Sequence, residues 1–388
     1  MKELQYPFDP QYILQKKKSL RRSLLADGTD RLAKKIAVLG GSTTSDIVRV
    51  LELFLLDQGI LPTFYECEYG QYEQEALFPG EELKAFAPDL IFVHTSSRNI
   101  RNWPEVTDTP EEVAQKLSSE IARFRSIWEH LQDQFHCPVI QNNMELPYYR
   151  ILGNRDCWDN RGHSHFTACL NQAFADYARE HEAFYLCDLH FAASDYGLRR
   201  WADPYFWNMY KYCMCLDAIP AFAFQVSHII KSIFGRNKKA LALDLDNTLW
   251  GGVIGDDGVN GIEIGQEIGT SQSYYEFQQY VKSLKSLGII LTVCSKNDEE
   301  NALEGLNHPE GALHPEDFVL IKANWENKDR NIIEIANELN ILPDSIVFVD
   351  DNPAERAIVA AQVNGVSTPV MDSDRDRKST RLNSSHRL

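Results

Sequence analysis

Residues that can support phosphoryl transfer follow apolar segments at several points in the C-terminal third of the chain. Asp244 and Asp246 come directly after the apolar run ALAL, and their spacing puts both side chains on the same side of an extended backbone. One carboxylate can attack phosphorus and form an aspartyl-phosphate, provided that a divalent cation neutralises the repulsion between the two anions. The other can protonate the leaving oxygen and then activate water. We therefore assign Asp244 as the nucleophile and Asp246 as the general acid/base.

The other parts of such a site follow in order along the sequence. Ser295, in TVCSKN, offers a hydroxyl to a phosphoryl oxygen just before a predicted helix, whose N-terminus favours anions. Lys328 supplies a positive charge, and SIVFVDDNP supplies Asp350 and Asp351, hard oxygen ligands of the kind that Mg²⁺ prefers. Each residue alone also fits a turn, a helix cap or a solvated position. The complete ordered set favours a magnesium-dependent phosphoryl-transfer site.

These segments together carry a family resemblance. DLDNTLWGGVIGDDG, CSKN, NWENK and FVDDNPAER resemble the HAD-IIIC group of the HAD superfamily, and specifically FkbH-like proteins, over residues 238–371. The resemblance implies roles for individual residues: Asp244 as nucleophile and magnesium ligand, Asp246 as acid/base that also gives its backbone carbonyl to the metal, Ser295 and Lys328 on the phosphate, Asp350 on the metal, and Asp351 as a further carboxylate there.

The same resemblance brings in acyl transfer, because FkbH-like proteins include enzymes that move a glyceryl unit from a phosphorylated glycerate to an acyl carrier protein. Cys294, directly before Ser295, is then a possible acyl nucleophile, since a thiol of lowered pKa can hold an acyl group as a thioester. Its other interpretation is a small buried apolar residue, because strand alternation turns it away from the side of Ser295.

Three functions follow for the C-terminal region. The first is a HAD-type phosphatase or phosphotransferase that acts on a small phosphorylated metabolite in carrier-linked biosynthesis. The second is a glyceryl or acyl transferase that loads an acyl carrier protein. The third is a scaffold that binds phosphate without turnover, which the complete acid/base pair disfavours.

The N-terminal region loosely resembles SGNH/GDSL esterases. KIAVLGGSTTSDI predicts a strand, a Gly-Gly-Ser turn and a helix, with Ser42 in the position of the nucleophile block. Asp188 and His190 resemble the late Asp/His block but have one residue between them where that family usually has two, and Asn142 or Asn143 offers an oxyanion donor outside the usual context. These departures favour a turn role for Ser42 and a substrate- or carrier-positioning role for the domain.

Apolar runs that alternate with helical stretches predict an α/β fold of two Rossmann-like or flavodoxin-like domains with parallel sheets. The second domain is expected to be HAD-like with a minimal cap, because the Gly-rich segment WGGVIGDDGVNGIEIG indicates a flap or hairpin. We predict a helical lead-in at residues 1–34, an SGNH-like domain at 35–235, a phosphoryl-transfer domain at 238–376, and a non-native Ser/Arg-rich tail at 377–388.

The charge and hydrophobicity of the chain restrict the classes of partner that we expect. A formal net charge of -17 repels polyanions, so we expect no nucleic acid partner. The apolar runs are far shorter than the roughly 20 residues of a membrane span, and the N-terminus has no apolar signal core, so we expect a cytoplasmic protein without a membrane partner. The eight scattered cysteines fit reduced thiols. The expected ligands are Mg²⁺ and a small phosphorylated substrate.

Overall fold

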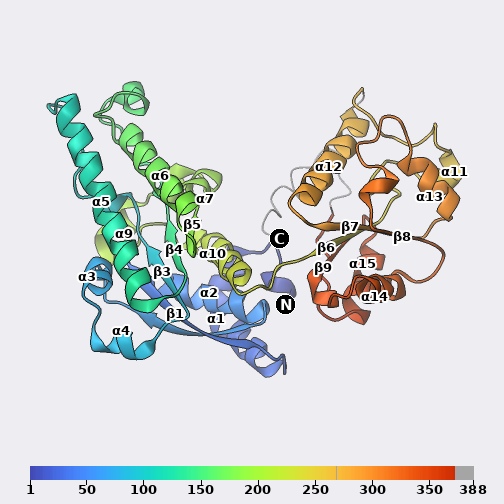
Figure 1. Cartoon of the computed structure of the whole chain (residues 1–388), viewed down its shortest axis with the longest axis horizontal. Helices are drawn as coiled ribbons and strands as arrows, with labels where there is room; N and C mark the ends of the chain where they lie inside the picture. Colours follow the sequence, from blue (N-terminus) through green and yellow to red (C-terminus); the bar gives the residue numbers. More distant parts are fainter. Residues whose placement is uncertain (268, 372–388) are drawn as a thin grey trace. The chain divides into compact units, whose positions relative to one another are not determined.

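The computed structural model describes residues 1–267 and 269–371, which form two compact units (Figure 1). The contacts divide the chain into Met1–Gly235 and Arg236–Leu388. Each unit contains one parallel sheet, and the predicted α/β fold class is thereby confirmed. The tail predicted at 377–388 lies outside the described residues. Within the described ranges, no helix combines the length and apolar character needed to cross a bilayer.

The first unit is built on a five-stranded parallel sheet in the order β2-β1-β3-β4-β5. Because β1 has β2 on one side and β3 on the other, the connections leave it in opposite directions, and this is the point of an open α/β sheet where ligands usually bind. The strands are β1 (Leu32–Gly40), β2 (Ile60–Glu66), β3 (Leu90–His94), β4 (Val139–Asn142) and β5 (Phe184–Cys187).

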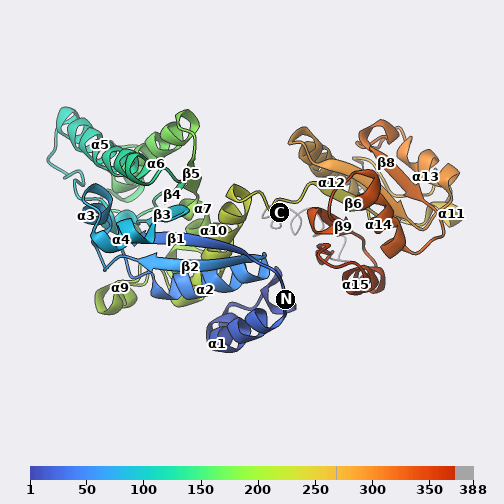
Figure 2. The same cartoon turned by 60° about the horizontal axis from the view of Figure 1, so that its bottom comes forward.

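Helices cover both faces of this sheet (Figure 2). Alternation along β1 shows the two layers, because Ile36 and Val38 pack with α1, α2 and α10, whereas Ala37 and Leu39 pack with α3, α4, α5 and α6. The helices are α1 (Pro10–Ala26), α2 (Ser45–Asp57), α3 (Tyr72–Leu77), α4 (Glu81–Phe86), α5 (Pro110–Phe135), α6 (His163–Glu180), α7 (Leu189–Tyr196), α8 (Leu198–Trp201), α9 (Pro204–Tyr210) and α10 (Ile219–Ile233).

The predicted helical lead-in is part of the first unit's core. Asp9 caps α1 by accepting hydrogen bonds from the backbone N–H groups of Gln11 and Tyr12, and Pro10 occupies the first turn. The apolar face of α1 buries Ile13 and Leu20, with Leu24, in the same cluster as α2. Strand β1 begins at residue 32, so the sheet starts before the expected domain boundary at 35.

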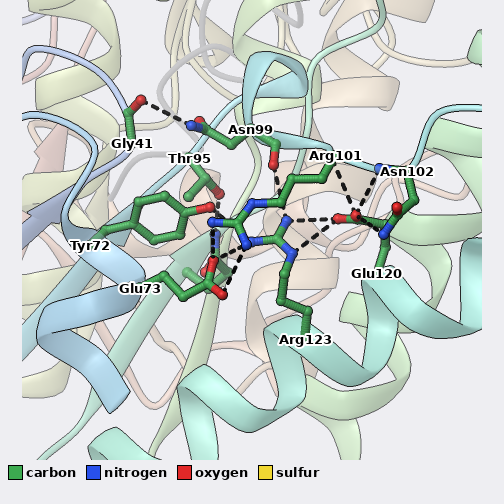
Figure 3. A network of polar contacts seen from close by, with 10 residues as sticks. Gly41, Tyr72, Glu73, Thr95, Asn99, Arg101, Asn102, Glu120 and Arg123 are labelled. Carbon is green, nitrogen blue, oxygen red and sulfur yellow. Dashed lines mark hydrogen bonds and ion pairs between the residues drawn. The ribbon is translucent and has the colours of Figure 1, made fainter. Parts of the chain in front are cut away.

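A polar network around Arg123 fixes the loop that follows β3 (Figure 3). Arg123, on α5, donates from Nη1 to Glu73 at 3.0 Å and from Nη2 to Glu120 at 2.7 Å. Nη2 also donates to the backbone carbonyl of Asn99 at 3.0 Å, and the Asn99 amide donates to the carbonyl of Gly41 at 2.9 Å. The network therefore connects α5 and α3 to the turns after β3 and β1.

Gly41 is required by this close approach. A Cβ atom at this position would lie 2.5 Å from the side chain of Asn99, well inside van der Waals contact. The absence of a side chain thus lets the turn after β1 and the loop after β3 lie against each other.

The second unit has a four-stranded parallel sheet in the order β8-β7-β6-β9. Along β6, Leu241 and Leu243 face one apolar cluster, and the small Ala240 and Ala242 face the cluster formed with α14 and α15. The elements are β6 (Ala240–Leu243), β7 (Ile290–Ser295), β8 (Leu320–Ala323), β9 (Ile346–Val349), α11 (Ile254–Asp257), α12 (Gly269–Ser286), α13 (Glu299–Leu306), α14 (Lys328–Glu338) and α15 (Pro353–Gln362).

The connection between β6 and α12 is short. Within its described residues, a single antiparallel bridge pairs Gly251 with Glu263, and the one-turn helix α11 lies between them. The predicted flap is present in this form, in place of a regular hairpin. The Asp257 carboxylate accepts a hydrogen bond from the N–H of Val253 at 2.9 Å, which turns the backbone into α11.

Candidate active site

The carboxyl ends of β6, β7 and β9 bring the predicted chemical residues together. Asp244 directly follows β6, Ser295 ends β7, and Asp350 directly follows β9. These three strands are neighbours and run parallel, so their ends meet at one edge of the sheet. Lys328 reaches the same edge from the first position of α14.

Lys328 forms two buried ion pairs at the centre of the site. Its ammonium lies 3.0 Å from Oδ2 of Asp244 and 2.6 Å from Oδ2 of Asp350. Burial acts to lower the pKa of Lys328, but the two carboxylates outweigh it and hold the pKa above its ordinary value. Burial also raises the pKa of Asp244 and of Asp350, and Lys328 opposes both shifts. The lysine therefore remains charged and compensates one of the two carboxylates.

Three carboxylates gather closely enough to hold one cation. Ligand oxygens of Asp244, Asp350 and Asp351 lie within 4.8 Å of one another. Arg356 fixes the turn that carries two of them, because its Nη1 donates to the backbone carbonyls of Asp350 and Asp351. Lys328 neutralises only one negative charge of this hard-oxygen set, so the residues fit a Mg²⁺ ion.

Asp246 has a different environment from the clustered carboxylates. Its Oδ1 accepts hydrogen bonds from Trp250 Nε1 at 2.9 Å and from the N–H of Ile254 at 3.1 Å, and its Oδ2 accepts from Asn297 Nδ2 at 3.0 Å. Burial raises the pKa of Asp246, although the bonds from Ile254 and Trp250 oppose the rise. A carboxyl group that is oriented in this way and has a raised pKa is suited to give and take protons.

Ser295 and Cys294 occupy opposite sides of β7. The Ser295 hydroxyl lies close enough to Asp244 to lower the pKa of that carboxyl. Cys294 is buried in the apolar cluster with α14, and its Sγ donates to the carbonyl of Lys328 at 3.7 Å. Burial raises the pKa of the Cys294 thiol well above its ordinary value. This environment matches the apolar interpretation of Cys294, and the acyl-nucleophile role stays a prediction that requires the thiol to become exposed.

Sequence reasoning did not assign the residues that support this site, namely Thr248, Trp250, Asn297 and Arg356. All four lie inside the segments that resemble FkbH-like proteins, so the sequence already marked these segments as part of the site. Spacing alone does not show which polar residue reaches Asp246, because that depends on the path of the connection after β6. Trp250, four residues after Asp246, lies beside it because one backbone bridge pairs these two residues and a second pairs Gly251 with Glu263.

The esterase-like residues of the first unit do not form a Ser-His-Asp arrangement. Asp188 caps α7 by accepting from the N–H of Phe191 at 2.9 Å, and it also accepts from Asn143 Nδ2 at 2.8 Å. Asn143 in turn accepts from the backbone N–H of His190. The buried Ser42 hydroxyl has no well-oriented hydrogen-bond partner in residues 1–267 and 269–371. Asp188 and Asn143 thus serve the local backbone, as helix-capping residues do.

The sheet and the ordered Asp, Ser, Lys and Asp residues define the second unit as HAD-like. The FkbH N-terminal domain family matches residues 35–231 of the chain. The structure of the N-terminal part of the protein BF1531 from Bacteroides fragilis, which contains a phosphatase domain and was crystallised with Mg, is similar over 96% of this chain and 98% of that one, with 30% identity and a TM-score of 0.87. The chain belongs to the FkbH-like family.

Other likenesses are weaker. A predicted HAD-like family hydrolase from Porphyromonas gingivalis is 14% identical over 38% of this chain and 98% of its own, with a TM-score of 0.29. The catalytic domain of peptidoglycan O-acetyltransferase A from Streptococcus pneumoniae is 11% identical over 53% of this chain and 96% of its own, also with a TM-score of 0.29. Neither likeness supports a function, and no curated protein matches the chain.

Proposed function

We propose that this protein is a magnesium-dependent phosphatase or phosphotransferase that acts on a small phosphorylated metabolite through Asp244. The observation that carries the proposal is the buried triad of Asp244, Lys328 and Asp350, with Asp246 oriented beside it. The similarity to a BF1531 structure that contains a phosphatase domain and Mg supports it.

The chain's own residues supply both halves of the reaction. The Asp244 carboxylate attacks phosphorus and the bond to the leaving oxygen breaks, while Asp246 gives that oxygen a proton. Water then attacks the aspartyl-phosphate, Asp246 takes its proton, and the Asp244 carboxylate is restored. Ser295 and Lys328 hold the phosphoryl oxygens. A magnesium ion held by Asp244, Asp350 and Asp351 would supply the positive charge that allows two anions to approach.

Family membership supports a finer proposal about the substrate. FkbH-like proteins include enzymes that load an acyl carrier protein, and we propose such a carrier as the partner here. The short connection between β6 and α12 leaves little protein to cover the site. A lightly covered site leaves room for a phosphate that is presented on a large carrier. Transfer of an acyl unit through Cys294 is the alternative reaction, and it requires access to a thiol that is buried here.

The test is phosphate release from a panel of small phosphates that includes phosphorylated glycerates, with and without Mg²⁺. Asp244→Asn is expected to lower the rate by roughly 10³-fold or more, because it removes the nucleophile. Asp256→Asn is the matched control, since Asp256 is an exposed carboxylate on α11 and should leave the rate unchanged. Phosphate binding without Asp244-dependent turnover would support the scaffold instead.

A second arm adds an acyl carrier protein and records its intact mass. A Cys294→Ala enzyme that loads the carrier as fast as the wild type rules out the thiol route, whereas loss of loading with normal phosphate release supports it.

A further inference from the structure

The carboxyl edge of the first sheet holds a second chemical cluster, which the phosphoryl reaction does not use. Ser42 lies in the turn after β1, His94 ends β3, Asn142 ends β4, and Cys213 comes from the segment between α9 and α10. The cluster lies where β1 and β3 diverge, at the usual ligand position of an open parallel sheet. Three of these residues form a chain of contacts from Cys213 through His94 to Asn142.

The contacts of Asn142 fix which nitrogen of His94 carries the proton. The Asn142 amide nitrogen donates to the backbone carbonyls of Thr95 and Asn143, so its Oδ1 is the acceptor toward the ring. Oδ1 lies 3.0 Å from Nδ1 of His94, which must therefore carry the hydrogen. The other nitrogen, Nε2, then presents its lone pair to Cys213 Sγ at 3.3 Å. His94 is thus oriented as a base toward this thiol.

The segment that carries Cys213 is anchored to the turn after β1. The N–H of Thr43 donates to the carbonyl of Lys211 at 2.9 Å, and the Thr43 hydroxyl donates to the carbonyl of Tyr210 at 2.7 Å. Tyr212 donates from its hydroxyl to Asp46, in the first turn of α2. The Cys213 residue is partly exposed, although burial dominates the environment of its thiol. The thiol is therefore held against His94 by a segment that is itself fixed to the turn after β1.

Ser42 supplies a donor beside the thiol. Its side chain is buried, at 2% exposure, and its hydroxyl has no well-oriented partner within the described parts of the chain. It lies close enough to Cys213 to lower the pKa of that thiol. A buried hydroxyl that makes no hydrogen bond costs free energy. It can donate that hydrogen bond to the carbonyl oxygen of a substrate, which becomes negative during the reaction.

We propose that Cys213 is the nucleophile of an acyl-transfer site in the first unit, with His94 as its general base and Ser42 as an oxyanion donor. The substrate class is an activated acyl ester or thioester. Nε2 of His94 takes the proton of the thiol as Sγ bonds to the carbonyl carbon. The tetrahedral intermediate then expels the alcohol or thiol, which receives that proton, and leaves the acyl group on Cys213.

The resting site is a neutral thiol and a neutral imidazole. Burial raises the pKa of Cys213 to about 12, Glu145 adds to the rise, and Ser42 and Arg98 oppose it. Burial lowers the pKa of His94 to about 4, although its bond to Asn142 opposes this. A preformed thiolate is thus absent, and acylation depends on proton transfer to His94 during attack.

The test uses the full chain and p-nitrophenyl acetate, with p-nitrophenol release followed by light absorption and the acetyl group located by peptide mass. We expect one acetyl group on Cys213. Neutral hydroxylamine should release it, because it cleaves thioesters. Cys213→Ala should abolish this adduct. Cys215→Ala is the matched control, since Cys215 is a partly exposed cysteine two residues away, and it should leave the adduct intact. Acetylation of Ser42 instead, or no difference between Cys213→Ala and the wild type, would overturn the proposal.

Two further variants test the roles of the neighbours. His94→Gln should slow acetylation by about 10²-fold or more, as expected for loss of a general base. Ser42→Ala removes only a hydroxyl that has no well-oriented partner among the described residues, so the fold should persist, and acetylation should slow by roughly 10²-fold. An unchanged rate in folded Ser42→Ala contradicts the oxyanion role, and an unchanged rate in folded His94→Gln contradicts the base.

Discussion

Lys328 is the residue on which the charge balance of the HAD-like site depends. Replacement by Met leaves Asp244 and Asp350 buried together without their shared ammonium. Removing one partner of a buried ion pair costs about 3–5 kcal/mol, so Lys328→Met should lose that much unfolding free energy in chelator. Mg²⁺ should restore part of it by supplying the missing charge, and urea unfolding with and without the ion measures both effects.

Lys322→Met is the matched control. Lys322 pairs with Glu334 and Glu338 at the protein surface, where such pairs contribute about 0–1 kcal/mol. A loss in Lys328→Met no larger than in this control would contradict the buried-pair account of the site.

His94 should make the stability of the first unit depend on pH. Its pKa in the folded chain, about 4, lies below its ordinary value of 6.5. The stabilisation from its neutral form is therefore fully present above pH 6.5 and is lost as the pH falls through about 4, by roughly 3 kcal/mol in all. Burial raises the pKa of Glu145 to about 7, so its contribution to stability increases as the pH falls. This contribution is present in both the wild type and the variant.

The difference between wild type and His94→Gln, measured by urea unfolding from pH 7 to pH 4, isolates this contribution. The stability difference should change with pH in the stated direction, and an NMR titration of the ring should find it neutral at pH 6. A ring that is protonated at pH 6 would refute the buried, neutral His94.

At the scale of elements, helix α5 carries a charged pair whose spacing is typical of a solvent-exposed surface but which is buried in the structure. Arg123 is 12% exposed and holds Glu120, which is fully buried, whereas Arg101 pairs with Glu73 while 58% exposed. Arg123→Ala should cost about 3–5 kcal/mol because it leaves the buried Glu120 carboxylate without its cationic partner. Arg101→Ala should cost less than about 1 kcal/mol. Thermal and urea unfolding compare the two, and equal losses would contradict a structural role for the network in Figure 3.

The same helix marks how far sequence reasoning reaches. Its beginning can be read locally, because Thr109 and Glu112 form a capping box and Pro110 occupies the first turn of the helix Pro110–Phe135. The pair of Glu120 and Arg123 has the spacing of an ordinary solvated pair. Its burial depends on α3 and on the loop after β3, which are distant in sequence, and no local pattern carries that information.

The phosphoryl-transfer site and the Cys213 site also differ in how far local sequence predicts them. Asp244, Ser295 and Asp350 are predictable because parallel strands place their carboxyl ends at one edge of the sheet, and Lys328 begins the helix that follows β8. The contact between His94 and Cys213 joins residues 119 positions apart, and neither lies in a recognisable motif. It arises only when the backbone of Thr43 anchors the segment before Cys213.

At the scale of the whole molecule, each unit has its own sheet, core and chemical cluster, so ligands can be assigned to units by local protection. Mg²⁺ at about 100 times its dissociation constant should stabilise the site that binds it by about 3 kcal/mol. Hydrogen exchange should therefore slow in peptides that cover the ends of β6 and β9, which carry the clustered carboxylates. Peptides that cover β1 contain none of these three residues and serve as the internal reference.

Asp350→Asn gives the control for this effect. It removes one charge from the cluster while keeping the size of the side chain, and it should weaken or abolish the magnesium-dependent protection. Protection that persists unchanged in Asp350→Asn, or that arises around β1 instead, would place the cation elsewhere. Because local protection is read without turnover, it tests the metal site even when the substrate is unknown.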